Sequence, residues 1–195
     1  MKRDTVVQKI PPAVELKFFD PAHLPTPAPP LKAGREAETD CQFKCDNNFD
    51  FDVFMRNNVA KPCWVVFRVT KVDTKISLPI TMWLPDGASG QLKAFEEGHR
   101  RIAEMVYSKA DDVAQESAHA AIGNLYMGEG ATPEAAEQAA LAKANKFVCE
   151  SYRSKTFNIA CEVSKVYDQL TNCAVEPDGV EQAVQEAFET FIRRN

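Results

Sequence analysis

The spacing of apolar residues changes once along this chain, and that change constrains the fold more than any other feature. Between residues 36 and 84, apolar and polar side chains alternate; in FDFDVF, for example, Phe49, Phe51 and Val53 alternate with aspartates. A period of 2 is typical of a half-buried β-strand. CWVVFRVTKV and DTKISLPITMWL are rich in β-branched and aromatic residues, so they predict two further strands.

After PDGASG the period becomes 3.6, as in an amphipathic helix, with one apolar stripe made of Leu92, Phe95, His99, Ile102 and Val106. This helical pattern runs on until GEG at residues 128–130. Another helix is expected to begin at Pro133, with Thr132 as its N-cap, and to break near Ser154. A last helix is expected to begin after Asp178. Strands followed by helices predict an α+β domain, with a small antiparallel sheet packed against long helices.

The N-terminal region is rich in proline, since residues 11–30 hold seven of the chain's 12 prolines. Proline removes backbone donors and favours an extended chain. We therefore expect a tether over residues 1–32 and a single folded domain over residues 33–195.

Charge and hydropathy exclude two classes of partner. The net charge is −5 and the basic residues are scattered, so the chain lacks the basic surface that nucleic-acid binding requires. No apolar run approaches the roughly 18 residues of a membrane-spanning helix, and the first residues lack the apolar segment of an export signal.

The six cysteines form an even set without a CxxC pair, which disfavours a four-cysteine zinc site. Disulfides in an oxidising compartment are the favoured interpretation, and free thiols in a cytosolic protein are the alternative. Six cysteines allow 15 pairings, so the connectivity stays open. A turn near Ser154 would allow Cys149 and Cys161 to pair.

One segment carries a catalytic motif in altered form. In LKAFEEGHRRIA, residues 92–103, the core FEEGH differs in one residue from the zinc-protease signature HExxH. In that signature two histidines four residues apart lie on one helix face and bind zinc, while the glutamate activates the metal-bound water. Phe95 stands at the first ligand position, Glu96 at the base position and His99 at the second ligand position.

Three segments in order are similar to those of one protein family. They are SLPITMW (residues 77–83), FEEGHRRIAE (residues 95–104) and YDQLTNCA (residues 167–174). The chain thereby resembles, over residues 34–174, the predicted secreted zinc-dependent proteases, a bacterial domain of unknown function. That family combines an LP-and-W segment, an HExxHR helix and a YDxxTxHG segment. The resemblance implies a zincin-like helix in an α+β peptidase domain.

The departures from the family fall at the metal ligands. Phe95 replaces the first histidine, and Cys173 and Ala174 replace the closing His-Gly. By resemblance, His99 remains as a metal ligand, with Cys173 as a thiolate substitute, whereas a catalytic zinc site needs three protein ligands. Tyr167, Asp168 and Thr171 match the later segment, where Asp168 would orient a metal-binding histidine.

Each of these residues also has a purely structural interpretation. Phe95 can fill the apolar stripe, and Cys173 can be half of a disulfide or, with His99 as base, a nucleophile. Asp168 can accept hydrogen bonds near a helix end. His99 can bond a carboxylate such as Glu96 at the edge of the core.

The two glutamates of FEEGH have an interpretation of their own. On an exposed helix face, Glu96 would pair with Arg100, and Glu97 with Arg101.

The leading hypothesis is a non-catalytic zinc-peptidase-like domain that has a structural role or binds a protein or peptide partner, without a cofactor. One alternative is an active zinc peptidase with Glu96 as general base and His99 and Cys173 as ligands. Another is a disulfide-stabilised binding module. The cysteine count and the resemblance together predict a periplasmic or secreted location.

Overall fold

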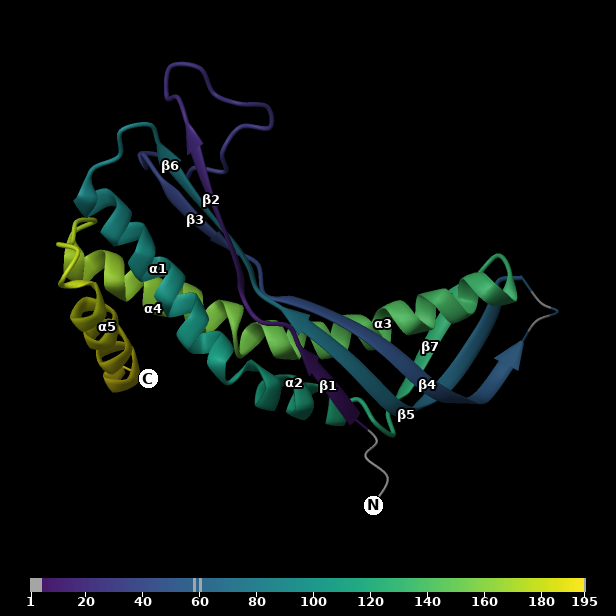
Figure 1. Cartoon of the computed structure of the whole chain (residues 1–195). Helices are drawn as coiled ribbons and strands as arrows, with labels where there is room; N and C mark the ends of the chain where they lie inside the picture. Colours follow the sequence, from purple (N-terminus) through teal and green to yellow (C-terminus); the bar gives the residue numbers. More distant parts are fainter. Residues whose placement is uncertain (1–4, 58, 60, 195) are drawn as a thin grey trace. The chain divides into compact units, whose positions relative to one another are not determined.

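The computed structural model describes residues 5–57, 59 and 61–194, in which strands β1–β7 and helices α1–α5 are found (Figure 1). Their contacts divide the chain into two compact units. Unit 1 comprises the described parts of residues 1–10, 44–76 and 109–155. Unit 2 comprises residues 11–43 and 77–108 and the described part of 156–195. Each unit contains strands and helices, which confirms the α+β class.

The sheet of unit 1 is organised around one long strand, β5 (Cys63–Ser77). Its neighbours are β1 (Thr5–Lys9), β4 (Lys44–Asn57) and β7 (Leu125–Gly130). β1 pairs with β5 in parallel from Val72 to Ile76, and β7 pairs with it in the antiparallel direction from Cys63 to Arg68. The sheet is therefore mixed and not purely antiparallel as expected.

The core of unit 1 lies between this sheet and helix α3 (Pro133–Ser154), which runs beside β7 and β4 (Figure 1). Phe67, Val69 and Val72 of β5 are fully buried, as is a row of small residues on α3 spaced by four: Ala136, Ala140, Ala144 and Val148. Spacing by four places this row on one helix face. Helix α2 (Ala110–His119) packs against β1 and α3.

Residues 125–130 were expected to end a helix and are instead strand β7. Helix α2 ends at His119, and the segment LYMGEG pairs with β5. The two glycines explain this position, because a Cβ atom at Gly128 would lie 2.9 Å from the Cβ of Ala140, and one at Gly130 would lie 2.6 Å from the backbone nitrogen of Ala136. The absence of side chains lets α3 approach the strand closely.

Unit 2 has a three-stranded sheet in the order β2 (Ala13–Phe19), β6 (Pro79–Pro85) and β3 (Glu38–Cys41). β2 is parallel to the central β6, and β3 is antiparallel to it. Pro79 is the first residue of β6, a position where a missing backbone donor is tolerated.

The N-terminal residues differ from the expected tether. Residues 5–9 and 13–19 are strands in parallel pairing with β5 and β6. The prolines that suggested a tether lie outside these strands: Pro11 and Pro12 separate β1 from β2, and the other five lie between residues 21 and 30. Proline composition therefore marks the connections here and not the whole segment.

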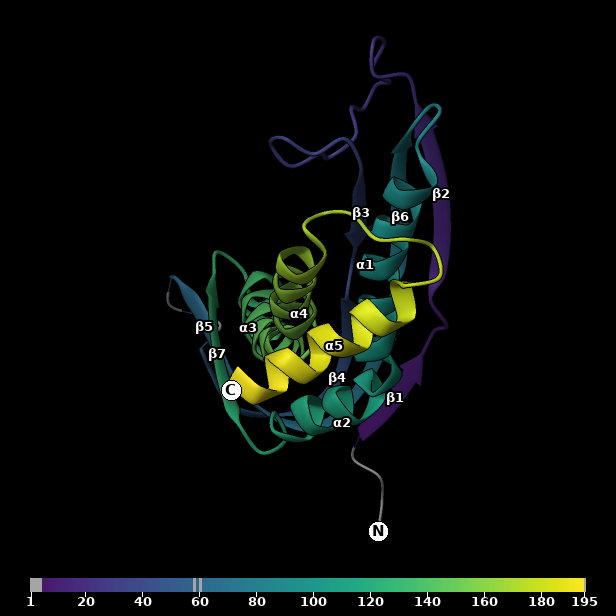
Figure 2. The ribbon, with the colours of Figure 1, turned by 90° about the vertical axis from the view of Figure 1, so that its left-hand side faces the viewer.

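Three helices pack together in unit 2: α1 (Gly90–Ser108), α4 (Phe157–Thr171) and α5 (Val180–Arg194). Helix α1 lies against β3 and β6, and α5 crosses α1 and α4 (Figure 2). Their apolar faces share one core, which includes Phe95, Ile102, Val163, Tyr167 and Val184.

The predicted helix limits are confirmed at two places. Thr132 caps α3 by accepting a hydrogen bond from the backbone nitrogen of Ala135, with Pro133 in the first turn. The break expected near Ser154 separates α3 from α4. Helix α5 begins at Val180, two residues after Asp178.

Candidate functional site

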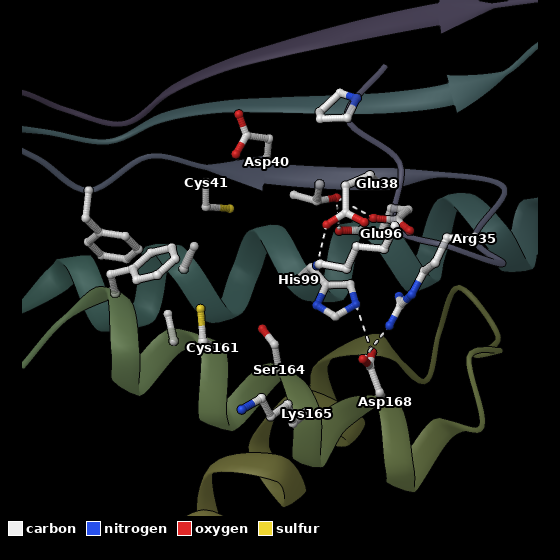
Figure 3. Close-up of a pocket in the computed structure, with 17 residues that line it drawn as sticks. Arg35, Glu38, Asp40, Cys41, Glu96, His99, Cys161, Ser164, Lys165 and Asp168 are labelled. Carbon is white, nitrogen blue, oxygen red and sulfur yellow. Dashed lines mark hydrogen bonds and ion pairs between the residues drawn. The ribbon is translucent and has the colours of Figure 1, made fainter. Parts of the chain in front are cut away.

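Unit 2 contains a pocket of about 480 Å³, which we call the unit 2 pocket. Its walls are β3, the segment before β3, and one face each of α1 and α4 (Figure 3). This volume lies within the range of small-molecule sites.

The unit 2 pocket has a polar end and an end lined mainly by apolar side chains. On α1, residues Glu96, His99 and Ala103 follow one another at spacings of three and four, and on α4 the lining residues are Phe157, Ala160, Cys161, Ser164, Lys165 and Asp168. Because His99 contacts Asp168, the polar side chains of both helices meet at one end. Cys41 and Cys161 lie away from them (Figure 3), and the rings of Phe43 and Phe157 are in edge contact, 6.5 Å apart.

Glu96, the expected general base, is a buried carboxyl at the polar end, with 1% of its surface exposed. The hydroxyl of Thr39 on β3 donates to Glu96 Oε2 at 2.6 Å. Burial raises the pKa of Glu96 above its ordinary value, although the Thr39 hydrogen bond and the charge of His99 oppose this shift.

The surface pairing expected for Glu96 is wrong. Arg100 pairs with Glu97 and Glu104, not with Glu96. The expected pair of Glu97 with Arg101 is confirmed at 3.3 Å.

His99 is held against a carboxylate of helix α4. Its Nε2 atom lies 3.1 Å from Asp168 Oδ1, and Arg35 pairs with Asp168 Oδ2. Burial tends to raise the pKa of Asp168, but the interactions with His99 and Arg35 outweigh it and hold the pKa below its ordinary value. His99 thus lies against the carboxylate of Asp168 and not that of Glu96, in a close contact that lacks hydrogen-bond geometry. Asp168 bridges elements distant in sequence and does not act as a local cap.

Glu38 on β3 completes the polar end. Lys32 Nζ donates to its Oε1 at 2.5 Å, whereas Oε2 is buried and has no hydrogen-bond partner among the described residues. The carboxyl group is nearly enclosed, because the Glu38 side chain is 10% exposed. A buried acceptor without a partner is costly, so Oε2 is available to a donor on a ligand.

The first ligand position of the HExxH pattern is part of the core. Phe95 is 1% exposed and stacks on Tyr167, with ring centroids 5.4 Å apart. This confirms that Phe95 fills the apolar stripe. Tyr167 also donates a long hydrogen bond of 3.4 Å to the Phe95 carbonyl, so this motif residue supports α1 from the core side.

The remaining motif residues lie outside the unit 2 pocket. The hydroxyl of Thr171 donates to the Tyr167 carbonyl, which places it in the last turn of α4. Cys173 follows that helix, is exposed, and does not line the pocket. The structure brings Glu96, His99 and Asp168 together, but Cys173 does not join them.

These residues do not fit a zinc site of the usual kind. Phe95 offers no donor atom, and Asp168 already lies against the Nε2 atom of His99. Within residues 5–57, 59 and 61–194, no group of three or more His, Cys, Asp or Glu side chains is placed to hold a metal ion.

Sequence reasoning missed Arg35, Glu38 and Thr39. Arg35 and Thr39 contact Asp168 and Glu96, which lie 133 and 57 residues away. Glu38 contacts Lys32, six residues before it. No local pattern marks them. The burial of Glu96 could have been predicted from spacing. Residue 96 lies four residues after Leu92 and three before His99, on the face of the helix that carries the apolar stripe.

All six cysteines are described and are free thiols, so the expected disulfides are not present in this structure. The compartment stays a prediction. No helix in the described residues has the length and apolarity needed to cross a membrane.

No protein-family model, no curated protein and no solved structure matches this chain.

Proposed function

We propose that unit 2 is a non-catalytic, zinc-peptidase-like unit whose pocket binds a small amine, such as the free amino terminus of a peptide next to an apolar side chain. The observation that carries this proposal is the unpaired, buried Glu38 Oε2 atom in a pocket with an apolar end. The resemblance to zinc peptidases rests on the sequence segments alone.

The contacts of the motif residues support the non-catalytic part of this proposal. Glu96 accepts from Thr39, His99 lies against Asp168, and Phe95 is packed on Tyr167. A hydrolytic zinc site would need two further protein ligands beside His99. Replacing Phe95 by histidine would supply one of them at most.

The ligand class follows from the balance of charge. Three carboxyl groups at the polar end, those of Glu38, Glu96 and Asp168, are no more than 25% exposed. One guanidinium, that of Arg35, is comparably buried. The amine of Lys32 is 71% exposed and can be displaced from Glu38. An ammonium group would donate hydrogen bonds to the unpaired oxygen and offset the negative charge of the carboxylates. The aromatic and aliphatic end would receive the adjoining apolar side chain.

The dipeptide amide Phe-Ala-NH₂ tests this proposal, with N-acetyl-Phe-Ala-NH₂ as the ligand control. Titration calorimetry on the full chain should detect binding of the free amine and at least tenfold weaker binding of the acetylated form, because acetylation removes the charge. Equal binding of both, or binding of neither, would contradict the proposal.

A matched pair of variants locates the site. Glu38→Gln should weaken binding about tenfold, whereas Glu186→Gln, an exposed glutamate of α5 outside the pocket, should not. An unchanged affinity in Glu38→Gln would place the amine elsewhere and overturn the assignment.

A further inference from the structure

Two cysteines of unit 1 lie in unusually close contact. Cys45 on β4 and Cys149 on α3 have their sulfur atoms 2.7 Å apart. A covalent disulfide has a length of about 2.05 Å, so bond formation would shorten this separation by only about 0.65 Å. Both residues are partly exposed, which gives a small oxidant access.

Asn47 holds both sulfur atoms from one side. Its Nδ2 atom lies 3.1 Å from Cys149 Sγ, 3.4 Å from Cys45 Sγ and 2.9 Å from Asn145 Oδ1. The hydroxyl of Thr74, which is 2% exposed, donates to Asn47 Oδ1 at 2.6 Å. This bond fixes the amide so that its nitrogen faces the thiols.

The environment distinguishes the two sulfur atoms. In the neutral pair the Cys149 thiol donates to Cys45 Sγ. Once Cys149 is ionised, hydrogen bonds with Cys45 and Asn47 favour the thiolate and lower the pKa of Cys149, although burial opposes them. The same contact with Cys149, together with burial, raises the pKa of Cys45. The Cys45 carbonyl oxygen lies 3.0 Å from Cys149 Sγ and favours its thiol form, which limits the shift. Because the thiolate is the reactive species, the lowered pKa of Cys149 favours it as the attacking sulfur, with Cys45 in contact to complete the disulfide.

We propose that Cys45 and Cys149 form a reactive dithiol that hydroperoxides convert to an intramolecular disulfide between β4 and α3. The Cys149 thiolate attacks a peroxide oxygen, the O–O bond breaks, and after protonation the products are a sulfenic acid and water or an alcohol. The Cys45 sulfur then attacks the sulfenic sulfur, an S–S bond forms, and water leaves with the Cys45 proton. In sum, two thiols are oxidised and one hydroperoxide is reduced.

Cys41, Cys63 and Cys173 differ from this pair in burial or exposure. Burial raises the pKa of the Cys41 thiol to about 12, which suppresses its thiolate at neutral pH. Cys63 is buried at 4% exposure. Cys173 is exposed. It is therefore the matched control for access without a neighbouring thiol.

Hydrogen peroxide is the probe, applied to the reduced full chain at pH 7 and followed by mass spectrometry of alkylated peptides. The wild type and Cys173→Ser should both lose two hydrogens and yield one Cys45–Cys149 cross-linked peptide. Cys45→Ser should instead accumulate a sulfenic acid at Cys149, trapped by dimedone. Cys149→Ser should react at least about tenfold more slowly at Cys45.

Two outcomes would overturn the proposal: oxidation of Cys173 before this pair, or wild-type reaction rates in Cys149→Ser. Circular dichroism of each variant would verify that it folds, and the peptide cross-link in Cys173→Ser tests the proposal without altering either thiol of the pair.

Discussion

The phenol of Tyr167 occupies the space that a side chain at Gly98 would need. A Cβ atom at Gly98 would overlap the hydroxyl oxygen and lie 2.9 Å from ring atom Cε1 of Tyr167. The glycine of FEEGH thus lets α1 and α4 approach closely enough for Phe95 to stack on Tyr167 and for His99 to reach Asp168. The helix packing that forms the polar end of the pocket depends on this contact.

Gly98→Ala should therefore destabilise the protein. Overpacking costs about 1–3 kcal/mol, and the higher helix propensity of alanine returns about 0.5–1 kcal/mol of this. We expect a net loss of roughly 0.5–2 kcal/mol in the free energy of unfolding, measured by urea denaturation. Gly90→Ala in the same helix is the control, because no atom lies within 4 Å of its Cβ position and no loss is expected. Equal stability of the two variants would show that α1 and α4 do not approach this closely.

Glu96→Gln should change how stability depends on pH. The folded pKa of Glu96 is raised, chiefly by burial, so folding favours the protonated form. Its contribution to stability is fully present below the ordinary pKa of 4.5 and falls as pH rises through the folded pKa. Glutamine stays neutral, so the variant does not lose stability in this way as pH rises. The variant should gain stability relative to wild type as pH rises from 4 to 8, as urea denaturation at each pH would measure. A difference that is constant, or that has the opposite slope, would contradict the buried position of Glu96.

Asp168→Asn should show the opposite pH dependence. The folded pKa of Asp168 is held below its ordinary value of 3.8 because His99 and Arg35 outweigh the effect of burial. The stability it supplies is present above 3.8 and is lost as pH falls through the folded pKa. At pH 7 the variant should lose about 1–3 kcal/mol, because Arg35 and His99 lose a charged partner. That cost should shrink as pH falls below 3.8, which denaturant titrations at pH 7 and pH 3 would reveal. A cost equal at both values would mean that the carboxylate charge contributes nothing.

Phe95→His should not create a metal site. It replaces a buried ring that stacks on Tyr167, and it leaves the third protein ligand unsupplied. We expect a loss of stability of at least about 1 kcal/mol and no zinc retained after dialysis. Retention of one zinc per chain by this variant would show that only the first histidine was missing.

The elements with strong periodicity could be predicted from the sequence, because burial of one face produces the pattern directly. The alternation in β4 and β5, the stripe of α1 and the cap of α3 are examples. The strand β7 could not, because its only local signal is two glycines, and their role depends on the approach of α3. The pairing of residues 5–19 with β5 and β6 likewise depends on partners far along the chain.

The candidate site was predictable in part. The spacing of Glu96 and His99 placed both on one face of a helix, and the later segment singled out Asp168. The contact between His99 and Asp168 joins residues 69 positions apart and required the packing of α1 on α4. Arg35 and Glu38 had no signal, since a single charged residue before or within a short strand looks like any solvent-exposed residue until its partners are known.

Zinc content per chain tests most directly whether FEEGH retains a catalytic metal site. The full chain would be purified, supplemented with zinc, dialysed and measured by mass spectrometry beside His99→Ala. A non-catalytic unit 2 predicts far less than one zinc per chain in both proteins, and no hydrolysis of a mixed peptide substrate. About one zinc per chain, lost in His99→Ala and accompanied by hydrolysis that Glu96→Gln abolishes, would contradict it.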